Sequence, residues 1–230
     1  MPSSESSVAP AGHDAEPPSY DRVPGYLKWL LAPFIWLDRQ FNRLYGSAYN
    51  PLYRSGTWAT TFLLIALASG IYLLIFYRVS APYESVQDMV ARPWLVGWVR
   101  SLHRYASDAA VVAVVVHILR MLAEGKTWGS RALAWLSGIV LVGIVLIVGF
   151  TGYVMVWDTQ AQALALAGAK FMKQIPIFDR EMGATFDNIV PPPTSFIFMN
   201  LIVHLLLPLF LFGVLWLHTM RVARAKWLPS

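Results

Sequence analysis

Long apolar stretches separated by short polar segments dominate the chain from residue 57 to residue 220. Three of them, residues 57–77, 132–157 and 196–220, contain no charged side chain. Each has at least the ~20 residues that an α-helix needs to cross a bilayer core. A fourth stretch, residues 94–122, has a similar length but contains charged residues, which at membrane depth usually face a protein interior or a cofactor. The pattern predicts four transmembrane helices.

The segment before the first predicted span has two parts. Residues 1–24 are rich in serine, proline and alanine, which is typical of a disordered tail, and they show no signal-peptide pattern. Residues 25–50 mix apolar side chains with charged ones such as Lys28 and Arg39, so they are predicted to form an amphipathic helix in the membrane interface. Residues 51–230 are predicted to form one domain of an all-α membrane protein, a four-helix bundle.

Composition and charge narrow the function classes. The chain is 57% hydrophobic and 13% charged, about half the charged share of a typical soluble domain. It has no cysteine, which excludes disulfides, cysteine-ligated iron–sulfur clusters or zinc, and covalent c-type haem. The net charge of +5 comes from basic residues near the span ends, without the basic stripe of a nucleic-acid surface. The expected partner is therefore a lipid membrane and not a nucleic acid.

The distribution of basic residues predicts the orientation of the chain. Four spans place both termini on one side of the membrane. The segments expected on that side hold Arg54, Lys126, Arg131 and Arg221 close to the spans, whereas the basic residues of the other side are diluted by acidic ones. By the positive-inside rule, both termini are expected in the cytoplasm of a cell with a bacterial-type inner membrane.

Four of the five histidines lie inside the predicted spans as two pairs with one spacing. Fourteen residues separate His103 from His117, and fourteen separate His204 from His218. Fourteen residues of α-helix come within about 40° of whole turns, so the members of a pair share a face and lie roughly 21 Å apart along the axis. Because the second and fourth spans run in the same direction, His103 is expected at the outer level with His204, and His117 at the inner level with His218.

Two imidazoles at each of two levels are a ligand set for two bis-histidine haems. Such a centre is six-coordinate, so it transfers electrons and leaves no position for a substrate. The alternative is that the four histidines form hydrogen bonds between helices. Matched spacing and matched level favour two non-covalent b-type haems at different depths.

Glycines repeat the same interval. Gly56 and Gly70 are fourteen residues apart at the first span, as are Gly138 and Gly152 in the third. Glycine allows a flat macrocycle to approach a helix backbone closely, which predicts a slot at each haem level. The alternative is ordinary packing of small residues between helices.

Arginines flank the histidines of the second span. Arg100 and Arg120 each lie three residues from the nearest histidine and are therefore adjacent to it on the helix surface. Their guanidinium groups are expected to bind haem propionates, with snorkelling toward the membrane interface as the alternative. Asp108 is interpreted as a partner of Arg104 within the helix.

Together these motifs resemble the amino-terminal half of cytochrome b in the quinol:cytochrome c reductase superfamily. The resemblance rests on Arg-x-x-His at residues 100–103, His-x-x-Arg at 117–120, Gly-Phe-Thr-Gly-Tyr-x-x-x-Trp-Asp at 149–158 and His-Leu-Leu-Leu-Pro at 204–208. It covers roughly residues 50–226.

The resemblance implies roles for these residues and for other chains. His103 and His204 would ligate an outer, low-potential haem, and His117 and His218 an inner, high-potential one. The glycines that repeat the histidine interval would be the haem-packing glycines. Expected partners in a dimeric complex are a Rieske-type iron–sulfur protein, a subunit resembling the carboxy-terminal half of cytochrome b and, as a further candidate, a cytochrome c-type subunit. Quinone is the expected substrate.

The chain also departs from the family pattern. It is expected to end after the fourth span, as split forms do, and so to lack the Pro-Glu-Trp-Tyr motif of the outer quinol site. It has no cysteine for the extra haem of photosynthetic split forms, its fourth-span histidines are fourteen rather than fifteen residues apart, and no arginine shortly precedes His204. Residues 158–195 are expected to be a loop that forms part of the wall of the outer quinol site. The alternative is that the prolines at 191–193 only provide a rigid entry into the fourth span.

The expected function is that of a dihaem cytochrome b subunit in a respiratory or photosynthetic quinol-oxidising complex. It would transfer electrons across the membrane between two bis-histidine haems and quinone, as an electron-transfer subunit rather than a complete enzyme. A second hypothesis makes the same dihaem chain the membrane anchor of a hydrogenase or other dehydrogenase. A third is a haem-free structural or transport subunit.

Overall fold

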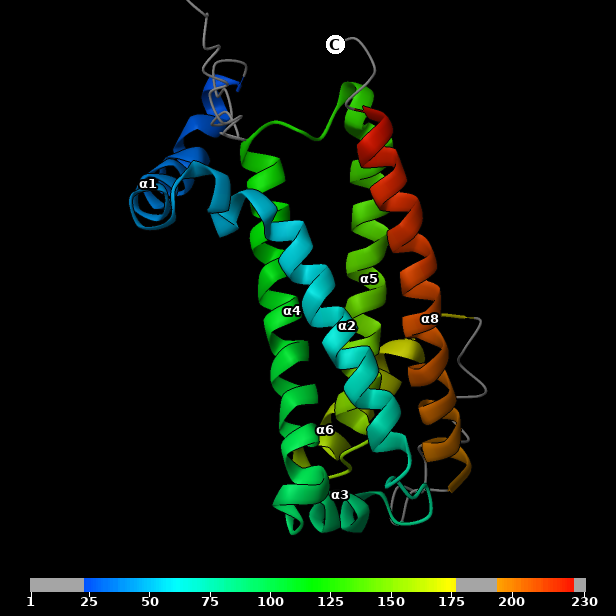
Figure 1. The fold of residues 1–230 in the computed structure, drawn as a ribbon. Helices are drawn as coiled ribbons and strands as arrows, with labels where there is room; N and C mark the ends of the chain where they lie inside the picture. The colour runs from blue at the N-terminus through cyan, green and yellow to red at the C-terminus, as the bar shows by residue number, and fades with distance from the viewer. Residues whose placement is uncertain (1–22, 177–193, 226–230) are drawn as a thin grey trace, which may run out of the picture.

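The structure is a computed structural model that describes residues 23–176 and 194–225. Every regular element in these residues is a helix (Figure 1). In chain order the α-helices are α1 (Lys28–Tyr45), α2 (Ser55–Leu74), α3 (Pro82–Val90), α4 (Trp98–Ala123), α5 (Ala132–Val154), α6 (Thr159–Met172) and α8 (Thr194–Ala225). Nearly all of the predicted tail and the prolines at 191–193 lie outside the described residues.

Four helices are long and apolar enough to cross a membrane, which confirms the four predicted spans. They are Pro51–Leu74, Pro93–Ala123, Gly129–Val154 and Thr194–Ala223. The largest difference from the sequence prediction is the start of the first span, at residue 51 rather than 57. Here the Asn50 side chain accepts a hydrogen bond from the Leu52 amide (2.9 Å) and Pro51 begins a 3₁₀ turn that continues into α2.

The spans pack as two helix pairs, α2 with α4 and α5 with α8. The buried side chains of α2 and α4 are mostly small, including Ala59 and Ala66 of α2 and Ala106 and Ala110 of α4. Small residues let two helix backbones approach closely, which in lipid favours association through van der Waals contact. Outside these interfaces the spans expose large apolar side chains along their length, as expected for helices that face hydrocarbon.

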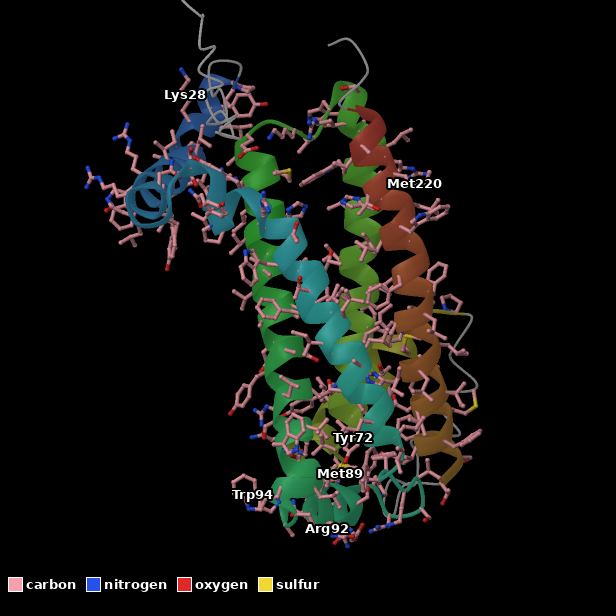
Figure 2. All side chains as sticks on the ribbon, viewed as in Figure 1. Lys28, Tyr72, Met89, Arg92, Trp94 and Met220 are labelled. Atoms are coloured by element: carbon pink, nitrogen blue, oxygen red, sulfur yellow. The ribbon has the colours of Figure 1, made fainter. Side chains whose placement is uncertain are left out.

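The two ends of the bundle differ. Helix α1 lies at the end where α2 and α5 begin and where α4 and α8 finish, whereas α3 and α6 lie toward the opposite end (Figure 1). Figure 2 shows Lys28 and Met220 toward the first end, and Met89, Arg92 and Trp94 at the other. These are called the α1 end and the α3 end below. The described beginning and finish of the chain share the α1 end, as four crossings require.

Sequence reasoning missed the two helices of the α3 end. The segment 158–195, predicted to be a loop, contains α6. Asp158 caps this helix by accepting a hydrogen bond from the Ala161 amide (2.8 Å), and alanines at every fourth position, 161, 165 and 169, are buried. Gly168 lies directly against α5, because a Cβ atom there would be 2.5 Å from Cζ of Phe150.

A hydrogen bond joins the two helix pairs at the α3 end. Tyr77, just beyond α2, donates through its hydroxyl to the carbonyl of Met155, just beyond α5 (2.8 Å). Tyr77 packs against the apolar cluster of Val154, Trp157, Ala165 and Ile197. Burial raises the pKa of the Tyr77 phenol above its ordinary value, so the hydroxyl keeps the proton that it donates.

We expect Tyr77→Phe to lower the free energy of unfolding by about 1 kcal/mol, since the Met155 carbonyl loses its donor while the ring remains. Tyr153→Phe is the matched control, because the Tyr153 hydroxyl donates to Gln160 on an exposed surface (2.7 Å) and its loss should cost less than about 0.5 kcal/mol. Unfolding by denaturing detergent in mixed micelles, followed by circular dichroism, measures both. Equal losses in the two variants would contradict the role assigned to Tyr77.

Candidate functional site

His103 of α4 and His204 of α8 face each other between the two helix pairs. Their ring centres are 6.4 Å apart and their planes differ by 74°. Two imidazoles bonded at about 2 Å to opposite sides of one metal ion have ring centres about 6 Å apart, so this separation leaves room for one ion. His117 and His218 interact electrostatically with each other. The structure therefore brings His103 and His204 together as expected from the sequence, and it places His117 and His218 near enough to influence each other electrostatically.

The donor set at each level is limited to two imidazoles. Within the described residues, no group of three or more histidine, cysteine, aspartate or glutamate side chains could hold a metal ion. A structural zinc site needs four protein ligands, and a catalytic one usually needs three. Two opposed imidazoles instead fit a metal ion whose other positions are filled by a macrocycle, as in a bis-histidine haem.

Each imidazole is bound through Nδ1 by a hydroxyl group of the neighbouring helix. The four Nδ1–oxygen distances are all 3.1 Å: His117 to Ser55, His103 to Ser69, His218 to Ser137, and His204 to Thr151. Nδ1 of His103 also contacts the carbonyl of Ala66 (2.8 Å), and Nδ1 of His204 contacts that of Val148 (3.1 Å).

These contacts assign the proton of three imidazoles, those of His103, His204 and His218, to Nδ1. The hydroxyls of Ser69, Ser137 and Thr151 donate to carbonyls one turn back in their own helices, so their oxygens accept from the histidine. The backbone carbonyls at His103 and His204 can only accept. Nε2 then carries the lone pair that binds a metal ion, an arrangement typical of metal-ligating histidines.

Sequence reasoning missed these four hydroxyl residues, although a repeated dipeptide marks them. Each one directly precedes a glycine of the fourteen-residue pattern, giving Ser-Gly at 55–56, 69–70 and 137–138 and Thr-Gly at 151–152. The hydroxyl and the glycine of each dipeptide contact the same imidazole. The recurrence of an alcohol before each glycine was the available signal.

The four glycines lie directly against the four imidazoles. A Cβ atom at each glycine would approach Cε1 of the ring to 3.2 Å for Gly56 and His117, 3.0 Å for Gly70 and His103, 3.3 Å for Gly138 and His218, and 2.7 Å for Gly152 and His204. A side chain at any of them would therefore press on the histidine. By contrast, a Cβ atom at Gly143 or Gly149 would meet nothing within 4 Å. In the structure these glycines therefore lie against the histidine rings. The sequence had predicted a different contact for them, with a macrocycle.

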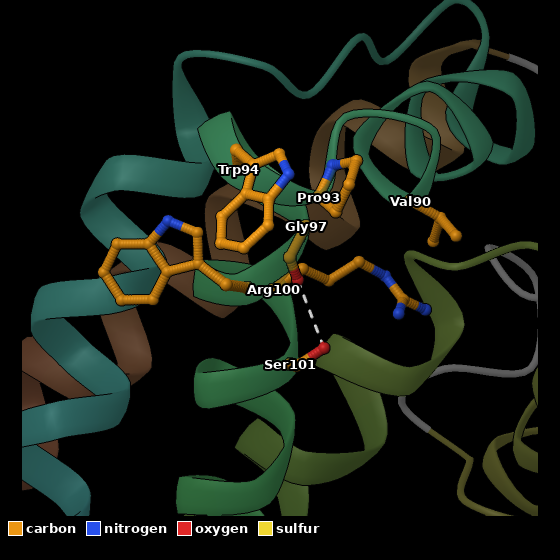
Figure 3. A pocket seen from close by; sticks show the side chains of 7 residues that line it. Val90, Pro93, Trp94, Gly97, Arg100 and Ser101 are labelled. Carbon is orange, nitrogen blue, oxygen red and sulfur yellow. Dashed lines mark hydrogen bonds between the residues drawn. The ribbon is translucent and has the colours of Figure 1, made fainter.

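Arg100 lies at the α3 end beside a pocket of about 580 Å³. Val90, Trp94 and Trp98 contribute to its lining, and Figure 3 shows the Arg100 side chain directed away from Trp94. The hydroxyl of Ser101, drawn in the same view, donates to a carbonyl of its own helix (3.1 Å). Arg100 is partly exposed, whereas Arg120 is buried, so Arg100 occupies the more open of the two predicted arginine positions.

The charges around Arg100 differ from those predicted. Arg100 interacts electrostatically with Arg104, one turn away, and with Asp158 at the start of α6. Within the described residues Arg104 and Asp108 form no ion pair, so the pairing predicted for them is wrong. Asp158, at the start of α6, is therefore the acidic residue that interacts with Arg100.

Arg120 is buried at the α1 end and bound by two carboxylates. Its two terminal nitrogens each donate to one oxygen of Asp38 at 3.0 Å, and its Nε donates to Glu124 at 2.8 Å. The rings of Tyr53 and Phe34 lie 5.0 and 6.0 Å from the guanidinium carbon. A haem propionate at Arg120, as expected from the sequence, would compete with these carboxylates. The structure gives Arg120 a further role, which is to join α1 to α4.

Comparison with known proteins identifies the family. Residues 41–225 match the family described as Cytochrome b/b6/petB. Cytochrome b6 of Heterocapsa triquetra is 32% identical over 123 residues, which are 53% of this chain and 56% of that protein. Cytochrome b of Dictyostelium citrinum is 30% identical over 176 residues, covering 73% of this chain and 44% of that protein.

A third relative matches over more of its length. Cytochrome b6 of Heliobacterium mobile is 24% identical over 176 residues, which are 75% of this chain and 83% of that protein. For the first two relatives, and for several others, the matched region is only about half of the known protein. Because the family match extends over most of the chain and over all four spans, the chain belongs to the cytochrome b family.

Proposed function

We propose that this chain is the dihaem cytochrome b subunit of a respiratory or photosynthetic quinol-oxidising complex, and that it transfers electrons across the membrane between two haems and quinone. Its family and its four apolar helices make it a multi-pass membrane protein that binds haem b and works in a complex with other subunits. One observation supports two haems in particular. The imidazoles of His103 and His204 face each other, His117 and His218 influence each other electrostatically at the second level, and each of the four has its Nδ1 bound by a hydroxyl.

In this proposal the side chains of the chain bind and orient the two cofactors. His103 and His204 would hold the haem at the α3 end, and His117 and His218 would hold the haem at the α1 end, roughly 21 Å away along the helices. When bound, a b-type haem with two imidazole ligands takes up and releases one electron at its iron. The hydroxyl residues keep each imidazole ring in the ligating tautomer, and the glycines leave space for the ring.

The two arginines have different parts in this proposal. Arg100 is the candidate partner of a propionate at the α3 end, where its environment is open. At the α1 end, Arg120 would bind a propionate only in exchange for a carboxylate that it already binds. The propionate role is therefore assigned first to Arg100.

We further propose the setting of the subunit. The partners are a Rieske-type iron–sulfur protein, a subunit resembling the carboxy-terminal half of cytochrome b and, as a further candidate, a cytochrome c-type subunit, in a dimeric complex. Membership of the cytochrome b family favours this setting over the anchor of a hydrogenase. The α1 end, which carries Arg54, Lys126 and Arg131, faces the cytoplasm of a bacterial-type membrane, and α1 rests in the interface with exposed Trp29 and Trp36.

The function is tested by quantifying haem and titrating its visible spectrum against potential in the purified complex. We expect two b-type haems per chain with separate midpoint potentials. Alanine at any of the four histidines should remove one of them, with His103→Ala and His204→Ala affecting the same haem and His117→Ala and His218→Ala the other. His13→Ala, outside the predicted spans, is the matched control. One haem or none in the unaltered protein would overturn the dihaem proposal.

The glycines predict a graded series. We expect Gly152→Ala to lower haem content at the His103–His204 level most strongly, because its Cβ atom would come within 2.7 Å of the imidazole. Gly138→Ala and Gly56→Ala, at 3.3 and 3.2 Å, should retain haem with a small spectral change. Gly143→Ala is the control with open space. The same haem content in all four variants would show that the glycines do not limit the position of the rings.

The hydroxyl partners predict a difference between the two levels. For His117, Ser55 is the one Nδ1 partner among the described residues, whereas His103 has the Ala66 carbonyl in addition to Ser69. Ser55→Ala should therefore weaken haem retention at its level by about 10–100-fold, as is usual when the partner of a metal-bound histidine is removed. Ser69→Ala should have a smaller effect. Haem loss during detergent dialysis measures both, and a larger loss in Ser69→Ala would contradict this assignment.

A further inference from the structure

Four charged side chains form a buried cluster at the α1 end: Asp38, Arg120, Glu124 and Lys126. The side chains of Arg120, Asp38 and Glu124 are at most 5% exposed, and that of Lys126 is 35% exposed. Arg120 binds both carboxylates, and Lys126 binds Glu124. Among these four side chains, two positive charges balance two negative ones. Burying such groups costs free energy, and removing one partner leaves an uncompensated charge.

This cluster is close to the predicted ligand of the α1 end. Arg120 is three residues after His117, so the two lie on one face of α4 within a single turn. The segment that leads from α1 into α2 provides a second connection between the charged cluster and His117. Asn50 donates to Asn42 of α1 (2.8 Å), caps the turn that follows, and so leads directly to Ser55, the partner of His117.

The α3 end has no comparable cluster among the described residues. Its ion pair, Arg78 with Asp88 (2.7 Å), is about half exposed on both side chains. Exposed pairs interact weakly with their surroundings because water screens them. A change of charge at Asp38 therefore acts in a buried environment near one histidine pair, whereas the same change at Asp88 acts in solvent near the other end.

We propose that Asp38 is a positioning residue that fixes and neutralises Arg120, and thereby sets the reduction potential of the haem held by His117 and His218. The inference rests on the proposed dihaem function. Reduction converts ferric to ferrous iron by adding one electron from the mediator, so a nearby positive charge favours it and a nearby negative charge opposes it. Since electrostatic energy falls with distance, the effect is concentrated at this haem, roughly 21 Å nearer along the helix than the other.

The test is a potentiometric titration of Asp38→Asn in the intact complex, with the α1-end haem identified by its loss in His117→Ala. We expect its midpoint potential to shift upward, because the cluster gains a net positive charge, while the other haem keeps its potential. The double variant Asp38→Asn with Arg120→Gln restores the balance of charge and should return the potential toward that of the unaltered protein. Asp88→Asn is the matched control and should move neither haem.

A second variant covers the case in which Asp38→Asn fails to fold. Glu124→Gln removes a carboxylate from the same guanidinium without touching α1, and should raise the same potential. An unchanged potential at the α1-end haem in a folded variant, or an equal shift of both haems, would overturn the role of Asp38. Absence of two haems from the unaltered complex would instead overturn the proposed function, so the two failures are distinguishable.

Discussion

The hydrogen bond between Nδ1 of an imidazole and a hydroxyl oxygen of the neighbouring helix is the interaction on which this bundle depends. It can form only when the serine or threonine helix and the histidine helix are in close contact, which requires small residues at the crossing. Glycine follows the hydroxyl at each of the four positions, so the ring lies against bare backbone. The pairing of α2 with α4 and of α5 with α8, the tautomer of each ring and the separation of the opposed rings are linked through this contact.

In a bundle built in this way, most contacts between the spans lie within the two helix pairs, and few lie between the pairs. The Tyr77 hydroxyl and the apolar cluster around Trp157 join them at the α3 end. Trp157 itself has a positive φ of 53°, unusual for a large side chain, in the turn that carries the chain from α5 into α6. Gln162 donates to its carbonyl (3.1 Å) and stabilises that turn.

The sequence was informative where hydrophobic length and spacing alone determine the outcome. Long apolar stretches, three of them uncharged, predicted the four spans, and an interval of fourteen residues predicted that His103 faces His204, because helix geometry converts both into position. It was less informative where tertiary contacts decide. The partner of Arg120 is Asp38, 82 residues away in sequence, and no local pattern indicates that pairing. Helix α6 was missed because its buried face consists of alanines, whose contribution to an apolar pattern is weak.

The repeated dipeptides have an architectural consequence. In each helix pair, the first helix supplies an alcohol and a glycine at two depths, and the second supplies a histidine at the same two depths. The two pairs are thus alike in pattern and direction, as in membrane proteins made of parallel repeats related by an axis along the membrane normal. In the proposed dihaem arrangement each pair would contribute one ligand to each site, so neither pair would be sufficient alone. Two copies of a single ancestral hairpin, associating about that axis, would already have presented both pairs of opposed imidazoles.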